Sequence, residues 1–119
     1  MSDGNYRLRT QLPNGRIQIG YINSQTEKYG QLNIRRIASP GYKSNTPLSA
    51  SVANQLLENN ADTIVGAWQT VKGGNEKYLT QYVAKFPANS DAQKLGDTLS
   101  IVLKNADQME KVLTGKDNY

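Results

Sequence analysis

Apolar and polar residues alternate near the start of the chain, where the even positions from 6 to 12 are Tyr, Leu, Thr and Leu. A period of two residues is typical of a β-strand with one buried face. Asn14-Gly15 follows this segment, and the pair favours a two-residue type I′ turn because asparagine and glycine both accept positive φ. We therefore expect a β-hairpin over residues 6–22.

The length of this turn determines which residues pair across the hairpin. A two-residue turn places Leu12 opposite Ile17 and Leu8 opposite Tyr21, so the apolar residues of both strands share one face. The other face is then polar and basic, and it is predicted to carry Arg7, Arg9, Gln11, Arg16 and Gln18.

A third strand is expected at residues 31–38, after a polar turn at residues 24–30. We expect Ser39-Pro40-Gly41 to end this strand, because proline lacks the N–H that a β-ladder needs and glycine favours a turn.

A helix is expected to follow, with Thr46 as its N-cap and Pro47 in its first turn, where the missing N–H costs little. Asn59-Asn60 is the predicted stop. The apolar stripe of this helix consists of Leu48, Val52, Ala53, Leu56 and Leu57.

Two further apolar segments, 64–72 and 77–86, predict a second hairpin with its turn at residues 73–76. The last helix is expected to begin at Ser90, which forms a capping box with Gln93, and to end at Gly115. Apolar residues recur every three or four positions along this helix: Ala92, Leu95, Leu99, Val102, Ala106, Met109, Val112 and Leu113.

The predicted order is β-β-β-α-β-β-α, and short connections favour antiparallel neighbours. We expect one α+β domain over residues 1–115, with a five-stranded antiparallel sheet and both helices packed on one face. Residues 116–119 are expected to form a flexible tail.

The 119-residue chain contains no cysteine and no histidine, which excludes disulfides, thiolate nucleophiles and the commonest general base and metal ligand. Asp107 and Glu110 stand one helical turn apart, as paired catalytic carboxylates do. Their neighbours Lys104 and Lys111 favour a simpler interpretation, an exposed ion-pair face. We therefore expect no enzymatic activity, no bound metal and no cofactor.

Charge is unevenly distributed, because every arginine lies within the first 36 residues of a chain whose net charge is +4. Arginine suits anionic or aromatic partners, so a basic binding surface is one interpretation, and a solvated sheet face kept soluble by charge is the other. Two tyrosines in the predicted loops lie near these basic residues. The candidate partner-binding residues are Arg7, Arg9, Arg16, Arg35, Arg36, Tyr29 and Tyr42.

No apolar run approaches the roughly 18 residues that a membrane span requires, and no charged-then-apolar leader precedes the first predicted strand. We therefore expect a cytoplasmic protein that does not bind membranes.

The second half of the chain resembles the YbjN-like and type III secretion chaperone-like proteins of bacteria. The segments that carry the resemblance are Gly66-Ala67-Trp68-Gln69, residues 90–95 and residues 106–110, and the predicted order of strands and helices agrees over nearly the whole chain. The resemblance implies a small cytosolic domain that dimerises and holds an extended segment of a partner protein.

Two features differ from that family. Its members usually begin with an amphipathic helix, whereas only residues 1–5 precede the first predicted strand here. Dedicated secretion chaperones tend to be acidic, whereas this chain has a pI near 9.4.

Our leading hypothesis is a non-enzymatic protein-binding or chaperone-like regulatory domain that forms a homodimer. The alternative is a nucleic-acid-associated regulator that uses the same arginines as phosphate contacts.

Overall fold

The computed structural model describes residues 6–13, 15–73 and 77–114. Predictions for Asn14, for residues 74–76 of the second turn, for the Gly115 stop and for the tail lie outside the described residues. The described elements are β1 (Tyr6–Gln11), β2 (Ile17–Ile22), β3 (Glu27–Tyr29), β4 (Leu32–Ser44), α1 (Ala50–Asp62), β5 (Ala67–Lys72), β6 (Tyr78–Pro87) and α2 (Ala92–Thr114).

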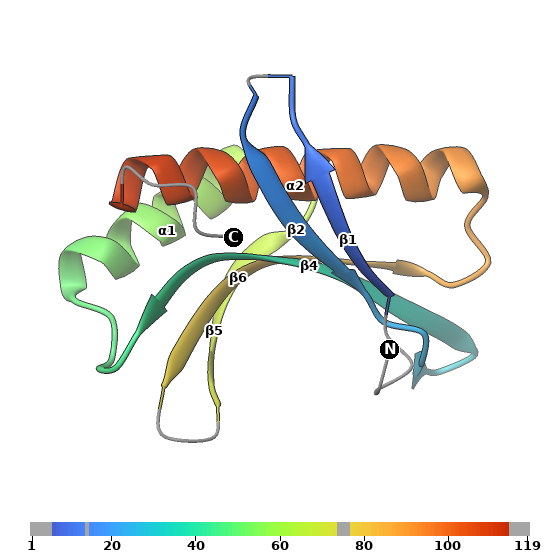
Figure 1. The fold of residues 1–119 in the computed structure, drawn as a ribbon. Coiled ribbons are helices and arrows are strands. Elements are labelled where there is room, and N and C mark those ends of the chain that lie inside the picture. The colour runs from blue at the N-terminus through green and yellow to red at the C-terminus, as the bar shows by residue number, and fades with distance from the viewer. Residues whose placement is uncertain (1–5, 14, 74–76, 115–119) are drawn as a thin grey trace.

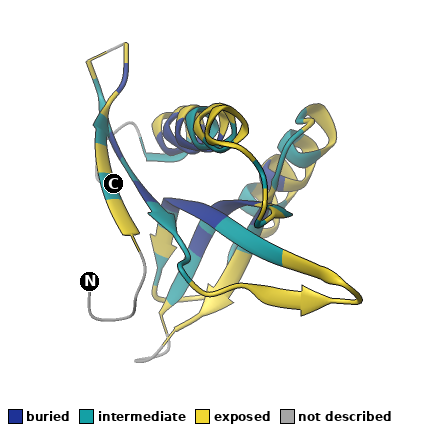
Figure 2. Ribbon diagram, turned by 90° about the vertical axis from the view of Figure 1, so that its right-hand side faces the viewer, coloured by how far each residue is buried: buried dark blue, intermediate teal, exposed yellow. Residues whose placement is uncertain are grey.

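The six strands form one antiparallel sheet in the order β1-β2-β4-β6-β5, and β3 pairs with β4 beside this path. The β1–β2 hairpin stands steeply against the central strands and crosses α2 (Figure 1). Viewed along α2, that helix lies between the hairpin and α1, and both helices lie on the same side of the central strands (Figure 2). The predicted α+β class is confirmed, and the predicted number of five strands is corrected to six.

The sixth strand, β3, lies where a polar turn was predicted. Its three residues are exposed and pair with β4 from Glu27 opposite Ile34 to Tyr29 opposite Leu32. A segment this short and polar has no buried face to give it a period of two, so its sequence pattern is that of a loop.

The pairing of β1 with β2 is shifted by one residue from the predicted register, because Gln11 lies opposite Ile17 and Leu8 opposite Gly20. The amide of Leu12 donates to the carbonyl of Arg16 at 2.7 Å and closes a loop one residue longer than predicted. A two-residue turn would require Pro13 to donate that bond, and proline has no N–H. The shift reverses the two faces of β2, so that its even-numbered residues face α2.

Strand β4 does not end at Ser39-Pro40-Gly41 but continues to Ser44, with an irregularity between Pro40 and Tyr42. Proline is tolerated in a sheet at such a bulge. Gly41 is required for packing, because a Cβ at this position would come within 2.6 Å of a ring carbon of Trp68.

The core lies between the sheet and the two helices, and Trp68 packs edge-on against Tyr82 at its centre, with ring centroids 5.3 Å apart. The buried residues of this core are Ile37, Leu56, Trp68, Tyr82, Ala84, Val102, Ala106 and Met109. Ala92 and Val112, at the two ends of the predicted α2 seam, are exposed.

Both helix caps differ from prediction by one or a few residues. Ser49, not Thr46, caps α1, and its hydroxyl accepts a bond from the amide of Val52 at 3.2 Å. At α2, the Asp91 carboxylate accepts from the amide of Lys94 at 2.8 Å, so that Asp91 takes the capping position predicted for Ser90. Each segment contains a second capping side chain within three residues of the predicted one, and sequence alone does not rank them.

Candidate functional site

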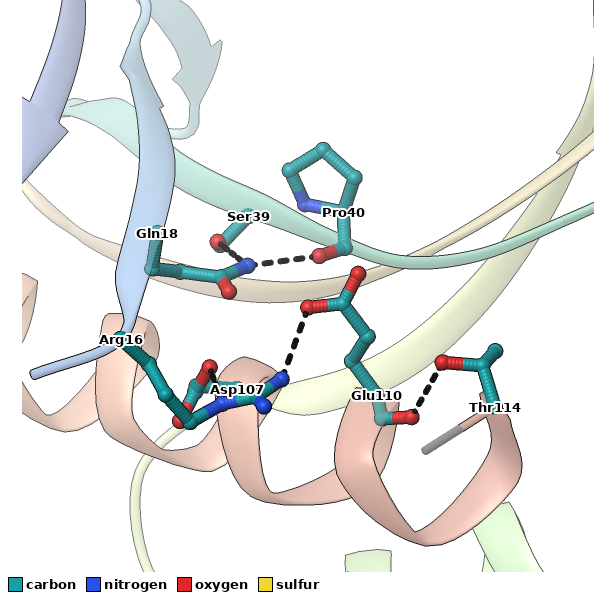
Figure 3. A network of polar contacts seen from close by, with 7 residues as sticks. All are labelled: Arg16, Gln18, Ser39, Pro40, Asp107, Glu110 and Thr114. Atoms are coloured by element: carbon teal, nitrogen blue, oxygen red, sulfur yellow. Dashed lines mark hydrogen bonds and ion pairs between the residues drawn. The ribbon is translucent and has the colours of Figure 1, made fainter. Parts of the chain in front are cut away.

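A buried charged cluster joins the hairpin to α2 (Figure 3). The Arg16 guanidinium, just before β2, donates from Nε to Asp107 Oδ1 at 2.7 Å and lies with Nη2 3.5 Å from Glu110 Oε1. The side chains of Asp107 and Glu110 are 2% and 0% exposed, and that of Arg16 is 19% exposed. We call these three residues the Arg16 cluster. One guanidinium thus forms ion pairs with two buried carboxylates.

Gln18 extends this polar contact to β4. Its amide nitrogen donates to the hydroxyl of Ser39 and to the carbonyl of Pro40, both at 2.8 Å (Figure 3), and the Ser39 hydroxyl donates to the carbonyl of Ile19 at 2.6 Å. Described backbone pairing between β2 and β4 covers only two residue pairs, at Tyr21 and Ile22. Side-chain bonds therefore hold the two strands together where they diverge.

This arrangement overturns two predictions. Arg16 and Gln18, expected on the outer face of the hairpin, face the helix side because the register shift turns β2 over. Asp107 and Glu110 do not form an exposed ion-pair face with Lys104 and Lys111, because the hairpin covers that side of α2. The geometry gives these carboxylates a role in holding the hairpin on the helix.

The other candidate residues are dispersed. Arg35 lies on the helix side, and its Nη1 donates to the carbonyls of Asn23 and Ser24 at 2.6 and 2.9 Å. Arg36, next in sequence, lies on the opposite side and forms an ion pair with Glu27 at 2.6 Å. Tyr29 is 79% exposed in β3.

Tyr42 is half-buried and lies on the helix side, opposite the buried Thr80. The structure therefore does not bring the seven candidate residues into one site.

The side of the sheet away from the helices carries five basic residues of the described strands, and we call it the open face. Paired residues run across it from Arg7 through Tyr21, Ala38 and Val83 to Ala67. All but one of its charged side chains are basic: Arg7, Arg9, Arg36, Lys43 and Lys85, with Glu27 as the acid.

Apolar side chains lie between these charges. The register shift places Ile17, Ile19 and Tyr21 on the open face, where all three remain half-buried. Arg9 lies opposite Ile19 and Arg7 opposite Tyr21, both arginines are exposed, and neither has an ion-pair or hydrogen-bond partner among the described residues. The sequence analysis did not place Ile17 and Ile19 on the surface, because the alternation of apolar and polar residues assigned them to the buried face.

The described residues contain no group of three or more acidic side chains placed to hold a metal ion. Neither described helix is long and apolar enough to cross a bilayer. Comparison of the chain with protein-family models, curated proteins and solved structures found no match.

Proposed function

We propose that this chain is a non-enzymatic protein-binding domain of the chaperone-like kind, which engages a partner protein through the open face. The observation that carries the proposal is the composition of this face, where exposed arginines alternate with half-buried apolar residues opposite the two helices. Arginine and tyrosine are enriched at protein interfaces, and apolar area between them supplies the buried centre.

A nucleic-acid-associated regulator is the second candidate. The exposed Arg7 and Arg9 and the exposed ring of Tyr29 favour it, because phosphates pair with arginine and bases stack on aromatic rings. The aliphatic side chains of Ile17 and Ile19 favour a protein, since a nucleic acid offers them little apolar surface.

On the family resemblance, we also propose that the protein is bacterial and cytoplasmic and that it forms a homodimer. A dimer that joins two open faces would bring basic residues together, which costs free energy. The end of the sheet at α1 and β5 is the better surface for a dimer, because Leu57 and Ile64 are exposed there.

The experiment compares capture of lysate components by the wild-type chain, by Ile19→Thr and by Lys94→Glu at about 50 and about 200 mM salt. Threonine keeps the β-propensity of position 19 but removes its apolar contact, and Lys94 is an exposed control on α2. We expect a stoichiometric protein at both salt concentrations that Ile19→Thr loses and Lys94→Glu retains. Nucleic acid that dissociates at the higher salt would instead favour the second candidate.

A further inference from the structure

The two edges of the sheet differ in how far they are blocked. At the β5 edge, the amide of Trp68 already donates to the side chain of Asn60 at 2.6 Å, and α1 lies against this strand. At the other edge, no described segment pairs with the outer side of β1 (Figure 1). Strands β1 and β5 have six residues each, so β1 is the less obstructed of the two edges, and its backbone is available to a further strand.

The ladder determines which backbone groups of β1 point outward. Leu12 and Arg16 form a hydrogen-bonded pair, and such pairs recur at every second residue of an antiparallel ladder. Thr10 and Leu8 therefore bond to β2, and the N–H and C=O groups of the odd-numbered residues point away from it. The outward-facing residues are Arg7, Arg9 and Gln11.

The side chains of these same residues lie on the open face. In a strand added at this edge, the residues directly opposite Arg7 and Arg9 would place their side chains beside the two guanidinium groups. Both arginines are exposed and have no partner among the described residues. Acidic side chains at the opposite positions of an added strand would therefore pair with them.

The intervening side chains of an added strand would point to the helix side. There Tyr6 and Leu8 of β1 line a groove of about 560 Å³ together with Ile22 of β2 and Leu95 of α2. A groove of this size, with mostly apolar walls, takes apolar side chains.

We propose that the β1 edge binds an extended segment of a partner protein in which acidic residues at alternate positions are separated by apolar residues. The acidic residues pair with Arg7 and Arg9, and the apolar residues enter the groove beside Leu8. This inference rests on the proposed protein-binding function and specifies its ligand. A second copy of this chain does not fit the edge, because a β1–β1 pairing that includes both arginines of each copy places arginine opposite arginine.

The test uses a labelled nine-residue peptide with glutamate at alternate positions and valine or isoleucine between them. A peptide with lysine in place of glutamate and a scrambled peptide of the same composition serve as controls. Binding is measured by fluorescence anisotropy, and amide hydrogen exchange is followed by NMR. We expect the glutamate peptide alone to bind and to slow exchange at Arg7, Arg9 and Gln11, while Leu8 and Thr10, already bonded to β2, change little.

The charge-reversed variant Arg7→Glu/Arg9→Glu is expected to weaken binding of the glutamate peptide about tenfold or more and to bind the lysine peptide instead. Both positions are exposed, so the variant retains the wild-type fold, which its thermal unfolding checks. Lys94→Glu, a single charge reversal on α2 away from this edge, leaves binding unchanged.

Three results would overturn the inference: no binding of the glutamate peptide, equal binding of the lysine peptide, or binding without slower exchange at the three outward amides. None of them contradicts the proposed function itself, which fails if the lysate yields only salt-sensitive nucleic acid or if capture of the protein is unaffected by Ile19→Thr. The two failures are therefore distinguishable.

Discussion

Replacement of Arg16 by methionine tests whether the Arg16 cluster stabilises the fold. Methionine keeps much of the length and apolar stem of arginine but removes the guanidinium that lies 2.7 Å from Asp107 and 3.5 Å from Glu110. Breaking a buried ion pair by removing one partner costs about 3–5 kcal/mol, because the remaining charge stays buried. The Arg16 side chain is 19% exposed, so water offsets part of this cost, and we expect about 3 kcal/mol.

A loss of this size is a large share of the roughly 5–15 kcal/mol by which a domain is stable. Urea unfolding followed by fluorescence of Trp68, which is buried in the core, is the assay. With a slope of about 1–3 kcal/mol per molar urea, the midpoint should fall by about 1–3 M. The triple variant Arg16→Met/Asp107→Leu/Glu110→Leu should recover most of the loss, since apolar replacement of a buried ionic group is often neutral or stabilising.

A stabilising role for the Arg16 cluster is refuted if Arg16→Met unfolds within about 0.5 kcal/mol of the wild type, the range of ordinary surface substitutions. It also fails if the triple variant is no more stable than the single one, because the loss would then not come from buried charge. Arg16→Lys offers a finer comparison. Lysine keeps the charge but cannot reach both carboxylates with a planar fork, so an intermediate midpoint is expected.

Three further variants test the packing and capping contacts. Gly41→Ala should lower the free energy of unfolding by about 1–3 kcal/mol, because the new Cβ clashes with the Trp68 ring. Gly96→Ala, in open space on α2, should raise it by about 1 kcal/mol. Thermal unfolding of the two variants compares them directly. Asn59→Ala should lower the free energy of unfolding by about 1–3 kcal/mol, since it removes the acceptor 2.7 Å from the indole Nε1 of Trp68. A red shift of the Trp68 fluorescence would report the lost contact. A variant with unshifted fluorescence and wild-type stability would contradict this expectation. Ser49→Ala should cost about 1 kcal/mol in urea unfolding, and a neutral result would mean that Ser49 is not the functional cap of α1.

The elements with a clear period were predictable because a period reports local geometry. The alternation of residues 6–12 defined β1 and also which of its faces meets the helices. The 3-4 spacing from Leu95 to Met109 located α2, and its buried Val102 and Ala106 lie in the predicted seam. In both cases the period of the pattern matches the local geometry of the element.

The β1 edge and the open face were only partly predictable. Arg7 and Arg9 were named from charge and prove to be exposed on one face, which agrees with prediction. Arg16 and Arg35 were named on the same grounds and lie on the helix side. Charge identifies a basic segment, but the side on which each guanidinium lies depends on strand register, and one proline beside the turn changed that register.

By itself, the sequence determined the kind and order of most elements and the α+β class, because periodicity, turn residues and helix-forming segments act over a few neighbouring positions. Only the tertiary structure decided which face of β2 is buried, that β4 continues through Pro40 and Gly41, and that Asp107 and Glu110 are buried. Each of these depends on contacts between residues distant in sequence. Asp107 and Glu110 are buried against an arginine that lies 91 or more residues away in the sequence, and no local pattern reports that contact.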